Sequence, residues 1–128
     1  MRVLLDSHTL LWWLIGDPRL SRRAQEVIER AADSIFVSAA SIWEIAIKTA
    51  KGKLRLPGGA EDRIRNEMTA AGFVELPVTW DHAFAVRSLD AHHLDPFDRL
   101  LIAQSRIEGL IIVTNDKLLR RYEVDCLW

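Results

Sequence analysis

This sequence of 128 residues has a single cysteine, almost no excess of charge of either sign and no long apolar run. The one cysteine, Cys126, excludes an intrachain disulfide and favours a reducing compartment. No apolar stretch approaches the roughly 20 residues that cross a membrane. Asp6 interrupts the first apolar run too early for a secretory signal. We therefore expect a cytoplasmic protein that does not engage a membrane.

The charges nearly cancel, with 17 Lys and Arg against 18 Asp and Glu. Proteins that coat nucleic acid by neutralising phosphates are usually strongly basic, so this balance disfavours such a role. An enzyme that meets nucleic acid through one local patch remains open. Hydrophobic residues make up 49% of the chain and charged residues 27%, which are ordinary globular values. The length fits one domain, residues 1–128, with a core that needs no disulfide or metal.

Apolar runs of strand length alternate with helical patterns along the chain. Strands are expected at 3–5, 35–37, 73–76, 110–113 and 124–127. Helices are expected at 8–15, 21–32, 39–51, 60–71, 79–89 and 95–108, with a short one at 118–121. Ser21, Thr79 and Asp95 are the expected caps of three of these helices. Continuously apolar strands separated by helices are typical of a parallel sheet covered on both faces.

Four acidic residues lie near the ends of these predicted strands. Asp6 ends the first strand, and Glu44 lies early in the helix after the second. Asp116 follows the fourth strand, and Asp98 lies in the first turn of the helix before it. Parallel sheets bind ligands beyond the carboxyl ends of their strands. Asp98 can share that edge only if the start of its helix lies across the same end of the sheet.

Clustered carboxylates repel one another unless a cation lies among them. Mg²⁺ or Mn²⁺ suits such oxygen donors, and either ion can polarise a phosphodiester and activate water. Thr114 and Asn115 are the expected hydrogen-bonding supports for the acids. The four acids together therefore favour a metal site.

Each acid also has a purely structural interpretation. Glu44 fits a capping box that starts at Ser41. Asp98 fits a first-turn acid stabilised by the helix dipole, and Asp116 fits a cap of the last short helix. Asp6 is harder to explain in this way, because an acid directly after a buried strand is costly unless it is paired.

Four segments, 3–8, 38–44, 95–99 and 114–116, together resemble the PIN-domain nucleases. Within that family they are similar to the VapC-type toxins of bacterial toxin–antitoxin pairs. The resemblance implies a three-layer α/β/α fold with a central, mainly parallel sheet of about five strands. It also implies a Mg²⁺-dependent endoribonuclease, with Mn²⁺ as a second option, which acts on RNA and is inhibited by a cognate antitoxin.

The resemblance also assigns roles by position. It implies that Asp6, Glu44, Asp98 and Asp116 form the catalytic, metal-binding site, with Thr114 as a polar support. Ser7 stands where many relatives have threonine, and it keeps the hydroxyl group.

Basic and aromatic residues give further expectations. Lys48 and Lys51 continue the Glu44 helix and are our candidates for RNA phosphate contacts, although Lys48 also has the spacing of an ion pair with Glu44. Trp12 and Trp13 point about 100° apart on a helix, so both cannot face one core. At least one is expected to meet a partner, which the resemblance makes a second copy, in a homodimer, or an antitoxin segment. The other helical tryptophans, Trp43 and Trp80, are expected in the core.

Two other functions are alternatives to the nuclease. A receiver-like, Mg²⁺-binding signalling module needs an aspartate at the end of its third strand, where this chain has Glu75-Leu76-Pro77. A PIN-like protein kept only for binding is disfavoured by the complete set of acids. The four histidines match no zinc-site spacing and are expected in loops or on the surface: His8, His82, His92 and His93.

Overall fold

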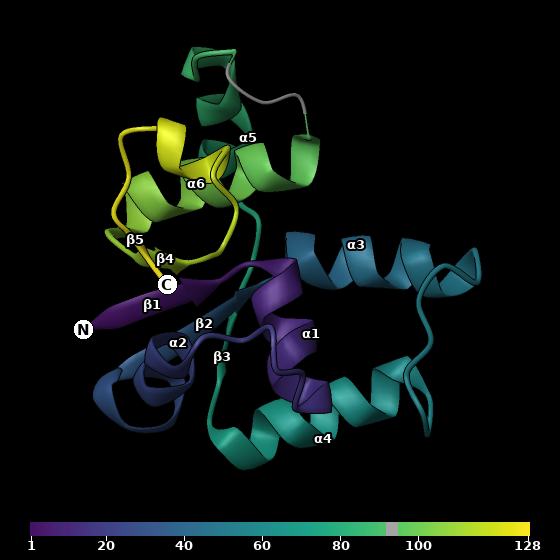
Figure 1. The fold of residues 1–128 in the computed structure, drawn as a ribbon. Helices are drawn as coiled ribbons and strands as arrows, with labels where there is room; N and C mark the ends of the chain where they lie inside the picture. The colour runs from purple at the N-terminus through teal and green to yellow at the C-terminus, as the bar shows by residue number, and fades with distance from the viewer. Residues whose placement is uncertain (92–94) are drawn as a thin grey trace.

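The computed structural model describes residues 1–91 and 95–128. Within them, five parallel strands form one sheet in the order β3-β2-β1-β4-β5 (Figure 1). The strands are β1 (Arg2–Leu5), β2 (Ser34–Ser38), β3 (Val74–Leu76), β4 (Ile111–Val113) and β5 (Cys126–Leu127). The predicted parallel sheet is confirmed, with the first strand of the sequence at its centre. This order differs from the 2-1-3-4-5 order of receiver-type sheets and counts against that alternative.

Helices cover both faces of the sheet (Figure 1). One face carries α1 (Ser7–Ile15), α2 (Arg22–Glu26) and α4 (Ala60–Ala71), and the other carries α5 (Trp80–Ala85) and α6 (Pro96–Glu108). The remaining helix, α3 (Ala39–Ala50), continues directly from the end of β2. The predicted three-layer α/β/α architecture is therefore confirmed.

Alternating side chains of β1 show why both faces must be covered. Val3 and Leu5 join the core cluster that includes α1, α2 and α4, whereas Leu4 packs with Leu101 and Leu110 on the other side. All three β1 residues are fully buried. A strand that is apolar at every position can be stable only between two helical layers, because successive side chains point to opposite faces.

Short polar side chains start most of the helices as the sequence predicts. Ser21 Oγ accepts the N–H of Ala24 at 3.0 Å, and Thr79 forms a capping box with His82. Gly109 ends α6 with a left-handed φ of 66°, a conformation in which glycine avoids the steric cost of a Cβ.

Three predicted helices depart from regular α geometry. The helix expected at 21–32 divides into α2 and a π-helical turn, Val27–Ala31. The helix expected at 79–89 ends in a 3₁₀ turn, Val86–Ser88, and the short helix at 118–121 is a 3₁₀ turn, Leu119–Arg121. None of the helices in the described ranges is long and apolar enough to cross a membrane.

Candidate active site

The candidate site lies at the edge of the sheet where the central strands end. Leu5, the last residue of β1, pairs with Val37 of β2 and with Val113 of β4. Asp6 therefore leaves the sheet beside the ends of its two neighbours, and Thr114 follows β4 at the same edge. The backbone N–H of Asp6 donates to the carbonyl of Val113 at 3.3 Å, which holds these two chain ends together.

Asp6 is buried, with 4% of its surface exposed. Its Oδ1 caps α1 by accepting the N–H of Thr9 at 2.8 Å, and its Oδ2 accepts the hydroxyl proton of Thr114. Burial raises the pKa of Asp6, because the ionised form loses its hydration, while the bonds from Thr114 and Thr9 oppose that rise. The position of Asp6 just before a helix is typical of a cap, a role that we did not predict for it.

Thr114 connects two of the predicted acids. Its hydroxyl donates to Asp6 and accepts the backbone N–H of Asp116 at 3.0 Å. The Oδ1 of Asp116 in turn accepts the N–H of Leu118 at 2.8 Å, so this acid also fixes the loop before the last 3₁₀ turn. Asn115, between them, is exposed. Thr114 thus lies where a supporting residue was expected.

Glu44 joins the same edge through Ser7. The Ser7 hydroxyl donates to Oε1 of Glu44 at 2.6 Å, and Lys48 Nζ lies 3.1 Å from Oε2. The capping box expected from Ser41 is wrong, because α3 already begins at Ala39 and is capped by Ser38. Glu44 therefore lies inside the helix, and its carboxylate contacts the side chains of Ser7 and Lys48 instead of capping the helix.

Asp98 lies in the first turn of α6, behind the predicted cap Asp95. The Oδ1 of Asp95 accepts the N–H groups of Phe97 and Asp98 at 2.9 and 3.1 Å. Phe97 contacts Trp43, and their ring centroids lie 5.2 Å apart. The residues that precede Asp98 and Glu44 are therefore neighbours, so the start of α6 lies beside α3. The sequence alone did not establish this placement.

The acids are linked but not gathered into one cluster. Among residues 1–91 and 95–128, no three His, Cys, Asp or Glu side chains are placed to hold a metal ion between them. The links run through two hydroxyls, from Asp6 to Asp116 through Thr114 and from Glu44 to the start of α1 through Ser7.

Basic residues flank these links. Lys48 pairs with Glu44, and Lys51 is exposed at the end of α3. Arg120 was not singled out from the sequence, yet its Nη2 donates to the carbonyl of Thr114 at 3.4 Å. No local pattern distinguishes Arg120 from its exposed neighbour Arg121.

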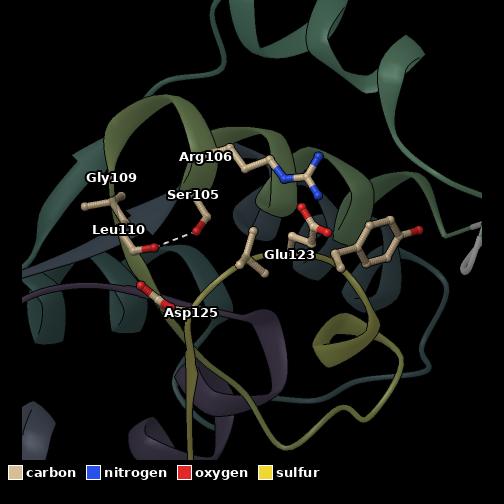
Figure 2. A pocket seen from close by; sticks show the side chains of 8 residues that line it. Ser105, Arg106, Gly109, Leu110, Glu123 and Asp125 are labelled. Carbon is tan, nitrogen blue, oxygen red and sulfur yellow. Dashed lines mark hydrogen bonds between the residues drawn. The ribbon is translucent and has the colours of Figure 1, made fainter.

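A groove of about 620 Å³ lies elsewhere, at the opposite end of β4 (Figure 2). Its walls come from the end of α6, the residues that enter β4, and segment 122–125. The Ser105 hydroxyl in its wall donates to the carbonyl of Leu110 at 2.5 Å, which ties the helix end to the strand. None of the predicted site residues lines this groove.

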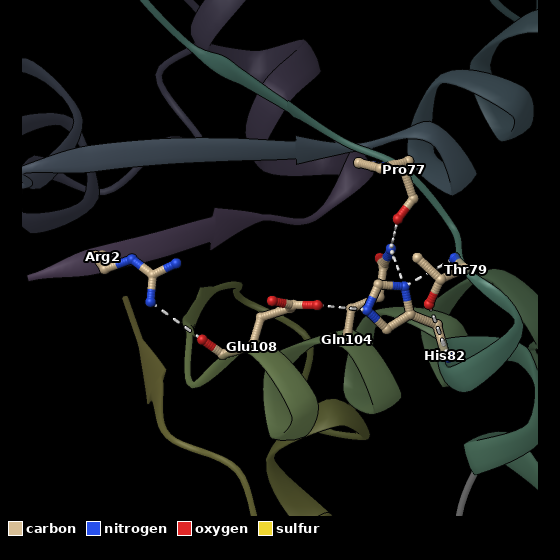
Figure 3. Close-up of polar contacts among 6 residues, drawn as sticks. All are labelled: Arg2, Pro77, Thr79, His82, Gln104 and Glu108. Atoms are coloured by element: carbon tan, nitrogen blue, oxygen red, sulfur yellow. Dashed lines mark hydrogen bonds and ion pairs between the residues drawn. The ribbon is translucent and has the colours of Figure 1, made fainter.

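A second buried polar cluster ties α5 to α6 (Figure 3). His82, expected at the surface, is only 1% exposed, which corrects that prediction. Its Nδ1 accepts the N–H of Thr79 at 3.0 Å, and its Nε2 lies 2.9 Å from Oε1 of Glu108. Gln104 donates to the carbonyl of Pro77 at 3.2 Å. His8 is exposed as expected, and His92 and His93 lie outside the described residues.

The exposure of the tryptophans contradicts part of what the sequence predicts. Trp43 and Trp80, expected in the core, are 61% and 84% exposed. Trp12 and Trp13, at least one of which was expected at a partner surface, are both half-buried. Trp13 packs on Phe73 with centroids 4.7 Å apart, and Trp12 lies 5.7 Å from the ring of Trp128.

Comparison with known proteins agrees with this architecture. The family model of the PIN domain matches residues 3–125. Ribonuclease VapC22 of Mycobacterium tuberculosis is 32% identical over 120 residues, which cover 94% of this chain and 91% of that protein.

Solved structures share the fold as well, and two of them illustrate the similarity. VapBC2 from Rickettsia felis, bound to a promoter DNA fragment, aligns with a TM-score of 0.73 and 13% identity over 100% of this chain and 99% of the other. FitAcB from Neisseria gonorrhoeae aligns with a TM-score of 0.69 and 17% identity, over 100% and 97% of the two chains. With a family model across nearly its whole length and a VapC relative of this identity, the chain belongs to the PIN-domain family and, within it, to the VapC type.

Proposed function

We propose that this protein is a metal-dependent endoribonuclease and the toxin of a toxin–antitoxin pair. The observation that carries the proposal is the hydroxyl of Thr114, which links Asp6 to Asp116 at the carboxyl edge of the sheet. Glu44 and the start of α6, with Asp98, lie at the same edge. The relative with 32% identity is named a ribonuclease, which supports RNA as the substrate.

The donor groups fit a hard divalent cation. The carboxylate of Asp6 is buried, and its bonds come from a hydroxyl and a backbone N–H, neither of which carries a full positive charge. A bound cation would favour the ionised form of Asp6 and so oppose the rise in its pKa that burial causes. Mg²⁺ is commonly held by one or two carboxylates and several waters, so it does not require three acids in contact.

Asp6 and Asp116 are the residues that would hold the ion, with Asp98 and Glu44 completing the acidic set. A bound Mg²⁺ or Mn²⁺ would supply Lewis-acid polarisation of a phosphodiester and a more acidic water. The chain itself orients the acids. Thr114 fixes the carboxylate of Asp6, and Ser7 fixes that of Glu44. We assign Asn115, exposed between Thr114 and Asp116, to the supporting polar groups.

Lys48 and Lys51 are the proposed contacts to RNA phosphates. They lie on the continuation of the helix that carries Glu44, so a strand that reaches the acids can follow them. Lys48 also neutralises Glu44 across 3.1 Å, which reduces repulsion between the acidic edge and a phosphate.

The proposed protein partners are a cognate antitoxin and a second copy of the chain. VapBC and FitAB complexes are among the solved structures that share this fold. Trp12 is the stronger candidate for a partner contact, because Trp13 packs against the core at Phe73. Alanine at position 12 should weaken copurification of the antitoxin, which we place in the neighbouring open reading frame. Alanine at position 13 should instead lower the melting temperature. Normal binding by a folded Trp12→Ala protein would contradict this assignment.

Cleavage of single-stranded RNA with and without chelator tests the enzyme. The purified chain should cut some RNA with Mg²⁺ or Mn²⁺ and lose that activity in EDTA. Activity should return when the ion is restored in excess, which separates metal loss from denaturation. Robust cleavage in chelator would contradict the metal-dependent mechanism, provided that Asp6→Asn protein purified by the same procedure is inactive, which excludes a contaminating nuclease.

A further inference from the structure

Trp43 is an exposed aromatic residue on the helix that carries Glu44. It directly precedes Glu44 on α3, and 61% of its surface is accessible. The ring it contacts belongs to Phe97, which directly precedes Asp98 on α6. Two aromatic side chains thus meet between the two helices that carry these acids. With this exposure, the indole of Trp43 adds little to the core and is accessible to a ligand.

The geometry of this pair leaves aromatic surface free. The centroids of Trp43 and Phe97 lie 5.2 Å apart, and the ring planes meet at 76°. In such an edge-to-face pair, at least one face of each ring stays uncovered by the other. Phe97 is half-buried, so it holds the indole of Trp43 from one side while most of the indole remains in solvent.

We propose that Trp43 is a stacking platform for an unpaired nucleobase of the RNA substrate. This inference rests on the proposed function and adds the part of the substrate that the acids cannot recognise. Sites for single-stranded nucleic acid combine exposed aromatic rings with nearby cations. Lys48 lies five residues beyond Trp43 on the same helix, and its ammonium group lies 3.1 Å from the carboxylate of Glu44. Because every base has a flat face, the platform favours unpaired RNA over duplex without requiring one base.

Trp80 provides a matched control. It is 84% exposed at the start of α5, and its helix carries none of the four acids. A general effect of removing an exposed indole should appear at both positions, whereas stacking beside the site should appear at position 43 alone.

The experiment measures kcat/KM on single-stranded RNA for Trp43→Ala, Trp43→Phe and Trp80→Ala. We expect Trp43→Ala to lose roughly tenfold, within the range measured for base stacking on aromatic side chains. Trp43→Phe should retain most of the activity, and Trp80→Ala should equal the wild type. Thermal unfolding of all three variants checks that they are folded.

An abasic scan of the RNA gives the decisive readout. Removing one base should lower kcat/KM of the wild type about tenfold at a single position and should have no effect on Trp43→Ala at that position. If Trp43→Ala and Trp80→Ala are equally active on intact RNA, the stacking platform is overturned, but the proposed nuclease function is not.

The mass of each variant in solution, measured by light scattering at the assay concentration, separates stacking from a protein contact. A Trp43→Ala variant that changes its mass and loses activity equally on intact and abasic RNA would show a contact between protein chains and overturn the proposal. A wild-type chain that neither binds nor cleaves single-stranded RNA would reject the proposed function, and the platform with it.

Discussion

Asp6 and His82 are two buried titratable side chains at helix starts, and their surroundings differ in one respect. His82 accepts the N–H of Thr79 through Nδ1, so Nε2 carries the ring proton and meets the carboxylate of Glu108 at 2.9 Å. Asp6 accepts one N–H and one hydroxyl, and neither donor is charged. The histidine is bonded at both nitrogens inside the protein, whereas the carboxyl of Asp6 is bonded by no charged donor that could stabilise its ionised form.

We take this difference to distinguish a structural cluster at His82 from the metal site that we propose at Asp6. Buried polar groups that are satisfied within the fold contribute stability, and removing one partner is costly. A buried carboxylate without a cation lowers stability, and such sites are enriched where a ligand supplies the missing charge. Substitutions at the two positions should therefore have opposite effects on stability and on activity.

The largest expected effect is on cleavage by Asp6→Asn. Asparagine caps a helix as well as aspartate does, so the bond from Thr9 should survive. RNA cleavage should fall more than about 100-fold, because loss of a ligand should exceed the effect of losing a supporting residue. In EDTA the variant should be at least as stable as the wild type. A variant that unfolds easily yet keeps full specific activity would contradict the assignment of Asp6.

Burial of Asp6 also predicts how that stability difference depends on pH. The folded protein holds the Asp6 proton more tightly than the unfolded chain does, because burial raises the pKa above the ordinary 3.8. As pH rises past that value, the metal-free wild type should lose stability that Asp6→Asn keeps. Melting temperatures in EDTA should be similar near pH 4 and should diverge towards pH 7, with the variant higher. Convergence instead of divergence would contradict the direction of this shift.

His82→Ala should lower stability and leave cleavage unchanged, which is the reverse of the effect expected for Asp6→Asn. The substitution removes the two imidazole bonds, one from the backbone N–H of Thr79 and one to Glu108, which together should cost about 2–4 kcal/mol of unfolding free energy. Urea unfolding measures this loss, and specific cleavage activity of the folded fraction should not change. Glu108→Gln is the milder control, because its amide oxygen can still accept the proton of Nε2. A loss of cleavage in stable His82→Ala protein would show that this cluster also serves the site.

Thr114→Val should lower both RNA cleavage and stability, each by a smaller amount than the substitutions above. Valine removes the hydroxyl that donates to Asp6 and accepts from Asp116. Cleavage should fall roughly 10- to 100-fold, as found for residues that orient metal ligands. Stability should fall by about 1–3 kcal/mol, because a buried oxygen of Asp6 loses its donor. Thr114→Ser keeps the hydroxyl and should restore both, so failure of serine to do so would point to packing of the methyl group instead.

Local patterns in the sequence predicted most of the fold. Continuous apolar runs placed all five strands, and the polar residues Ser21, Thr79 and Asp95 marked three helix starts. The parallel topology then placed Asp6 and Thr114 at one edge. These features depend on short stretches of chain and on one topological rule, so they can be predicted without long-range contacts.

Other features depend on contacts between distant segments. His82 is buried because Glu108, 26 residues later, meets its ring. The capping box at Ser41 was wrong because Ser38 has the same chemistry and stands where β2 ends. The exposure of Trp43 follows from which side of α3 faces the sheet, and Ile45 and Glu44 take the buried positions there. Hydrophobicity alone could not choose among these residues.

The bond from Thr114 to Asp6 spans 108 positions of the chain, and it joins the first strand to the fourth. An emerging polypeptide therefore carries Asp6, Ser7 and Glu44 long before the residues that complete their edge. Because β4 is a central neighbour of β1, no N-terminal fragment that ends before Thr114 can form the site. If the protein is the toxin we propose, its synthesis has a built-in delay. The proposed nuclease site cannot form until translation has passed Thr114, more than a hundred residues after Asp6.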